Sequence, residues 1–141
     1  MKTIRIVSVL ALLLIVSSPC FALVMIEPVS RERAEKDFGA RIRTEMVATK
    51  QVGVWLEFSP KGKLETFSSV QLDIMLAERR VVSATLSPLK QTPVTIVVYF
   101  STDPAYLSGS TFTVFYKSSG FPSYDGFSFK VSDFIKHGSS H

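Results

Sequence analysis

Hydrophobic and polar side chains alternate along much of the chain after Gly39. Such alternation is typical of β-strands, whose successive side chains point to opposite faces of a sheet. Segment 94–100 is instead apolar on both faces, as expected of a central strand. The pattern predicts an all-β domain of about seven strands, over residues 40–46, 52–58, 70–76, 81–86, 94–100, 111–117 and 127–135.

Turn-forming residues separate these segments at intervals of about ten residues. Ser59 to Gly62 has proline second and glycine fourth, and Glu78-Arg79 can form a tight turn. Asp103-Pro104 predicts a single helical turn that reaches Leu107. Short strands at this spacing favour two facing antiparallel sheets, an immunoglobulin-like or similar β-sandwich, and a small β-barrel is the alternative.

A short helix is predicted over residues 31–38, before the first of these strands. Ser30 can cap its first amides, and Gly39 can adopt the left-handed conformation that ends a helix. Its apolar stripe consists of Ala34 and Phe38 alone. We therefore expect a lid packed on the edge of a sheet rather than a membrane-binding helix.

Residues 1–22 have the layout of a secretory signal peptide. Lys2 and Arg5 provide a positive start, 6–16 is an apolar run, and the segment ends in small residues that favour cleavage after Ala22. We expect the product to be periplasmic or extracellular, in a bacterium. Cleavage also predicts that the mature protein has no stable membrane insertion.

Two other interpretations of the leader are less favoured. Cys20 could carry the lipid of a lipoprotein, but Ser17-Ser18-Pro19 is a poor match to such sites. Residues 6–26 carry no charge and are long enough to cross a bilayer uncleaved, although Pro19 interrupts them. With cleavage, residues 23–135 form one domain and 136–141 a flexible tail.

The composition excludes several classes of partner and chemistry. Cys20 is the only cysteine, so the mature chain can form no disulfide. The leader holds two of the sixteen basic residues and no acidic one, which reduces the net charge from +4 to +2. Basic and acidic side chains are interleaved rather than segregated, so a nucleic-acid partner is not indicated.

Catalytic groups are scarce. The only histidines, His137 and His141, lie in the tail, where a positioned base or a metal site is not expected. Glu57 and Asp73 on neighbouring polar faces could form the carboxylate pair of a small hydrolase. We expect no enzyme, no cofactor and no metal site. The only calcium candidates are Asp103, Asp125 and Asp133, and their spacing matches no known calcium motif. Roles in turns explain Asp103 and Asp125.

Exposed aromatic residues are the remaining candidates for function. Trp55 is predicted on the wet face of its strand, where it could anchor a partner or cover a gap under the Phe38 helix. Phe121 and Tyr124 lie in a glycine- and proline-bearing loop. The prediction is a non-catalytic exported module that binds a protein or supports an envelope component. The alternative is a carbohydrate-binding module in which Trp55 shares a platform with Tyr99 or Tyr124.

Overall fold

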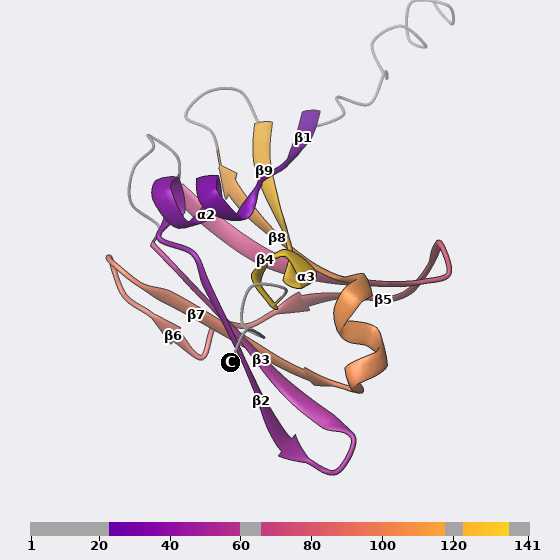
Figure 1. Cartoon of the computed structure of the whole chain (residues 1–141). Coiled ribbons are helices and arrows are strands. Elements are labelled where there is room, and N and C mark those ends of the chain that lie inside the picture. Colours follow the sequence, from indigo (N-terminus) through magenta and orange to yellow (C-terminus); the bar gives the residue numbers. More distant parts are fainter. Residues whose placement is uncertain (1–22, 60–65, 118–122, 136–141) are drawn as a thin grey trace, which may run out of the picture.

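The computed structural model describes residues 23–59, 66–117 and 123–135, and Figure 1 shows two β-sheets packed face to face. The large sheet has the strand order β1-β9-β8-β4-β5 and the small sheet the order β2-β3-β7-β6. All described pairings are antiparallel except β1 with β9, which is parallel. Side chains of residues 23, 24, 66, 123 and 124 are not described.

The nine strands within these described ranges divide between the sheets as follows. The large sheet contains β1 (Leu23–Pro28), β4 (Thr66–Leu76), β5 (Arg79–Leu86), β8 (Ser110–Lys117) and β9 (Ser123–Lys130). The small sheet contains β2 (Arg41–Ala48), β3 (Gln51–Phe58), β6 (Lys90–Gln91) and β7 (Ile96–Thr102).

The all-β, sandwich-like prediction is confirmed. Seven of the nine strands overlap predicted segments, whereas β1 and the two-residue β6 were not predicted. The fold is also not purely antiparallel, because β1 joins β9 in parallel. Within the described residues neither sheet closes on itself, which excludes the barrel alternative. Three predictions fall outside the described residues: the turn at 59–62 beyond Ser59, the loop residue Phe121 and the tail 136–141.

The core lies between the inner faces of the two sheets. Alternate residues of the central strands are fully buried there, for example Leu56 and Val98 from the small sheet and Val114 and Phe129 from the large sheet. The rings of Phe100 and Phe112 meet across the interface with centroids 5.4 Å apart. Each such side chain contributes roughly 1.5–3 kcal/mol when fully buried, so packing can stabilise the domain without disulfides.

Helix α2 (Arg31–Phe38) has the predicted bounds and caps. The Ser30 hydroxyl accepts a hydrogen bond from the Arg33 amide at 3.4 Å, and Gly39 is left-handed with φ 59°. Phe38 is buried with its ring 4.8 Å from that of Phe127 on β9. Its carbonyl accepts a hydrogen bond from the Ser59 amide after β3, so the end of the helix contacts both sheets.

The predicted strand over 127–135 is wrong in its second half. β9 ends at Lys130, and helix α3 (Val131–Ile135) follows. Lys130 pairs with Thr111, close to the first residue of β8, so the ladder offers no partner further along. A strand cannot continue without a partner in a buried setting, and the chain turns into a helix whose Val131 is buried.

A 3₁₀-helix, η1 (Pro104–Gly109), replaces the predicted single turn. Asp103 caps it, since its carboxylate accepts a hydrogen bond from the Ala105 amide at 2.9 Å. Gly109 ends the helix against the backbone of β4, where an added Cβ would lie 1.9 Å from the Met75 carbonyl oxygen. Glycine is therefore required there by close approach of two backbones.

Candidate functional site

The outer face of the small sheet carries the most distinctive group of side chains. Trp55 on β3 lies directly opposite Arg43 on β2 and Tyr99 on β7. The guanidinium carbon of Arg43 is 3.9 Å from the centre of the Trp55 ring, and the Tyr99 ring centroid is 4.8 Å away. We call Arg43, Trp55 and Tyr99 the Arg–Trp–Tyr ladder.

Gly53 makes room for the indole. A Cβ at Gly53 would lie 2.7 Å from an indole carbon of Trp55 and 2.9 Å from a methyl carbon of Val47. The far edge of the indole therefore extends along β3 and covers Gly53, which is buried although it lies on the outer face. Trp55 itself is half-buried, and Val47 remains exposed beside it.

Electrostatics add to this arrangement. A guanidinium over an indole face is attracted by about 0.5–1 kcal/mol at an exposed site. Arg43 also donates to the Glu45 carboxylate at 2.7 Å, with both side chains more than 60 % exposed (62 % and 63 %). An ion pair so exposed adds little stability. It places the Glu45 carboxylate beside the guanidinium that lies over the ring.

The structure brings together two of the predicted aromatic residues, Trp55 and Tyr99, and places Tyr124 elsewhere. Trp55 lies on the outer face, as the alternation predicts, and Tyr99 is beside it. Trp55 covers Gly53 rather than a gap under the Phe38 helix, because its ring contacts Arg43 and Tyr99 on the outer face, whereas Phe38 packs on Phe127 in the core. Tyr124 is on β9 of the large sheet, and Phe121 is outside the described residues.

The acidic candidates are also separated. Glu57 is exposed on the outer face of the small sheet. Asp73 lies on the opposite sheet, opposite Ser83, and accepts a hydrogen bond from Gln71 at 3.2 Å. Both carboxylates alternate with buried neighbours and so face away from the shared core. The structure does not bring this pair together.

The three calcium candidates occupy different elements. Asp103 caps η1 as expected of a turn residue, whereas Asp125 lies within β9, so its predicted turn role is wrong. Asp133 is in the first turn of α3. In the part of the chain that the structure describes, no three metal-binding side chains gather closely enough to hold an ion.

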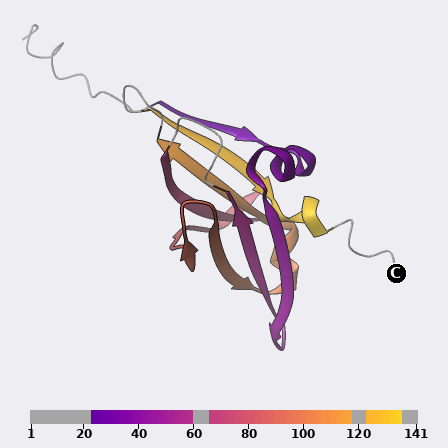
Figure 2. The same cartoon turned by 90° about the vertical axis from the view of Figure 1, so that its left-hand side faces the viewer.

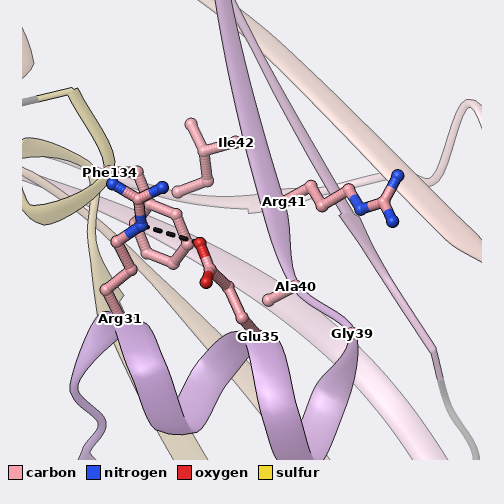
Figure 3. Close-up of a pocket in the computed structure, with 7 residues that line it drawn as sticks. All are labelled: Arg31, Glu35, Gly39, Ala40, Arg41, Ile42 and Phe134. Carbon is pink, nitrogen blue, oxygen red and sulfur yellow. Dashed lines mark hydrogen bonds and ion pairs between the residues drawn. The ribbon is translucent and has the colours of Figure 1, made fainter. Parts of the chain in front are cut away.

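A shallow pocket of about 450 Å³ lies between α2, β2 and α3 (Figure 3). Arg31 donates to Glu35 at 2.7 Å, and its guanidinium carbon is 5.8 Å from the centre of the Phe134 ring. The Arg41 side chain points away from these residues. The pocket's cation is thus already neutralised, and the pocket holds no free charge aimed at a ligand.

One ion pair joins α2 to β1. Arg33 donates to Glu27 on β1 and, at 3.2 Å, to Asp37 one turn further along the helix. The hydrogen bonds to Glu27 and then to Asp37 raise the pKa of the Arg33 guanidinium, which stays charged. These exposed pairs join the helix to the strand that precedes it and brace the helix internally, rather than forming a binding site.

The chain matches no protein-family model, no curated protein sequence and no solved structure. Among the described helices, none has the length and apolar character needed to span a bilayer.

Sequence reasoning found Trp55 but missed Arg43 and Gly53. Both occur in the alternating segments, and Arg43 is on the predicted wet face. Their importance depends on the cross-strand register, which places Arg43 opposite Trp55. Neither hairpin partner nor register can be read from alternation alone, because many registers preserve the same wet face.

Proposed function

We propose that this chain is an exported, non-catalytic binding module whose partner is another protein, either free or part of the cell envelope. The single observation that carries the proposal is the Arg–Trp–Tyr ladder on an open sheet face. Arginine, tryptophan and tyrosine are the residue types most enriched among those that dominate protein–protein binding energy.

The surroundings of the ladder support a protein partner. Val47 adds exposed apolar surface on the same face, and Arg41, Glu45 and Glu57 place charges of both signs around it. An apolar centre with a polar rim is the usual anatomy of a protein interface. Because Gly53 and Arg43 already hold the indole in place, little side-chain freedom remains to be lost on binding.

A carbohydrate ligand is the second candidate, favoured by the adjacency of Trp55 and Tyr99 on one face. Sugar rings bind by stacking on an aromatic face, and here Arg43 lies over the indole while Tyr99 flanks it from the other neighbouring strand. A sugar would have to displace the guanidinium and its cation–π attraction. This cost favours the protein partner.

Site-specific photocrosslinking tests the proposal. A photoreactive residue at Ser101, exposed beside Gly53 on the ladder face, is compared with one at Thr85 on the outer face of the large sheet. We expect one discrete protein adduct from Ser101 and none from Thr85. Trp55→Ala should abolish the adduct, whereas Met46→Ala, at a 59 % exposed residue whose strand position faces the other way, should not.

Intrinsic fluorescence provides the second readout, because Trp55 is the only tryptophan. The crosslinked partner, once purified, should change the Trp55 emission on binding. Emission that responds to glycans and not to this protein would support the carbohydrate alternative. An adduct that survives Trp55→Ala at the same yield would contradict the proposed site.

A further inference from the structure

The edge strands of the two sheets differ in how they are protected. An edge presents backbone N–H and C=O groups that can pair with another chain, and proteins guard such edges with charge, proline, bulges or short strands. The described sheets have four edges, at β1, β5, β2 and β6. Charges guard β2 at Arg41, Arg43 and Glu45, and Pro88 and Lys90 guard the two-residue β6. On β5 the charges, Arg79 and Arg80, stand only at the first two positions.

Register shifts strengthen two of these guards. The pairing of β2 is interrupted between Met46 and Ala48, and that of β4 with β5 between Ile74 and Met75. Bulges of this kind twist an edge away from a flat template. β1, with the sequence Leu-Val-Met-Ile-Glu-Pro, has no such interruption. Its single charge, Glu27, is held by Arg33 of α2, and Pro28 protects only its last position.

The register shows which backbone groups of β1 face outward. The Val29 amide donates to the Ser128 carbonyl of β9 at 2.9 Å. Backbone groups of alternate residues point to opposite sides of a strand, so Glu27 and Met25 also bond β9. Val24 and Ile26 therefore present both their N–H and C=O groups to the free edge, which Figure 2 shows along the top of the molecule.

Apolar side chains accompany this free edge. Met25 is 65 % exposed and Ile26 55 % exposed. A groove of about 380 Å³ runs beside them, with β1 as one wall and residues of β9, including Gly126 and Phe127, as the other. Among the residues that the structure describes, β1 thus combines unpaired hydrogen-bonding groups with uncovered hydrophobic surface.

We propose that β1 is a self-association strand, which pairs antiparallel with β1 of a second copy of this chain about a two-fold axis. Centring the axis on Met25 sets Val24 opposite Ile26 of the second copy and Ile26 opposite its Val24. Each pair exchanges N–H···O bonds in both directions, because these are the residues whose groups face outward. The two large sheets join into one continuous sheet.

A second copy fits this edge for two reasons. The outward groups are self-complementary about Met25, as a two-fold interface requires. Association through this edge also ends at two copies, because a two-fold interface uses the same edge, β1, of both copies. The dimer consumes the unguarded edges and leaves the small sheets, with their ladders, free. This inference does not depend on the proposed function.

Analytical ultracentrifugation tests the inference. The chain is expressed from Met1, and the intact mass of the purified protein shows whether residues 1–22 are still present. We expect a concentration-dependent mass of two copies. Ile26→Pro removes an outward N–H without touching the bonds to β9, a position where edge strands accept proline. It should weaken association about tenfold or more, since two copies lose one bond each. A proline at Met46 would disrupt the pairing of β2 with β3, so it cannot serve as a control. Met46→Lys, at an apolar residue as exposed as Ile26 but on another edge strand, is the control instead.

Thermal unfolding at low protein concentration shows whether the Ile26→Pro variant folds. If it does not, crosslinking keeps the inference testable. In a Cys20→Ser background, Met25→Cys places two thiols across the axis, where directly opposite Cα atoms lie about 4.5 Å apart, within disulfide reach. We expect rapid disulfide dimers from Met25→Cys and none from Met46→Cys. A single-copy mass at high micromolar concentration, or equal crosslinking of the two cysteine variants, would overturn the inference.

Discussion

Gly109→Ala is the most severe test of the packing between η1 and the large sheet. The new Cβ would lie 1.9 Å from the carbonyl oxygen of Met75 and 3.0 Å from its carbonyl carbon. Both obstacles are backbone atoms of β4, which is paired on both sides, with β8 and β5. Rotamer changes cannot relieve the overlap. The end of η1 therefore has to move away by more than about 1 Å before the new Cβ and the Met75 oxygen reach an ordinary van der Waals distance.

That movement breaks other interactions of the same segment. Ser110, the next residue, is buried, donates its hydroxyl proton to the Tyr106 carbonyl at 2.8 Å, and pairs with Ile74 of β4. Overpacking against side chains costs about 1–3 kcal/mol, and displacement of paired backbone adds to this. We expect Gly109→Ala to lower the free energy of unfolding by about 3 kcal/mol or more, a fall in Tm of about 10 °C.

Urea denaturation, followed by Trp55 emission and by circular dichroism, measures this difference. Ser108→Ala, at an exposed position of the same helix, should change the free energy of unfolding by less than about 0.5 kcal/mol. Gly39→Ala should cost about 1–2 kcal/mol, because φ is +59° there while the nearest atom, Ser59 Cβ, is a comfortable 3.9 Å away. A loss for Gly109→Ala no larger than that for Gly39→Ala would refute the steric reasoning.

Three further predictions concern other parts of the chain. Ala77 and Glu78 turn the β4–β5 hairpin with φ of 48° and 64°, so replacing them by Asn-Gly should stabilise the protein by about 1 kcal/mol; an unchanged or lower urea midpoint would contradict this. Phe129→Ala empties a fully buried site and should cost about 3–5 kcal/mol, and a calorimetric Tm near the wild-type value would count against it. When the chain is expressed from Met1 in a bacterium that secretes proteins, the intact mass of the product should match a chain beginning at Leu23. A product that retains residues 1–22 would disprove cleavage after Ala22.

The ladder and the β1 edge lie on different sheets. A two-fold dimer through β1 would present two ladders from one assembly. If both engage one surface, binding gains avidity without any new contact. Ile26→Pro should then weaken binding to a surface that carries many partners more than binding to a single partner in solution, while Trp55→Ala should weaken both.

Much of the fold could be predicted because its signals are local. The seven strands after Gly39 follow from side-chain period, and helix α2 begins and ends where Ser30 and Gly39 supply its caps. The scarcity of cysteine and histidine, and the wet-face position of Trp55, are likewise properties of the chain itself. These features depend on neighbours within a few residues, so they can be read without knowing the fold.

Other features depended on which strands became neighbours. Residues 23–28 show no alternation to separate them from the apolar leader, and they are a strand only because β9 offers them a parallel partner. Residues 131–135 keep a strand-like composition, yet β8 supplies no partner beyond Thr111, so they form a helix.

The sequence by itself thus determined the strand-forming segments, the capped helix and the outward-facing position of the tryptophan. Only the tertiary structure decided that Arg43 and Tyr99 flank Trp55, that Glu57 and Asp73 face opposite directions, and that β1 has an open edge. The physical reason is that alternation specifies a face, while register and sheet order specify the neighbour, and these are settled by long-range pairing across the whole domain.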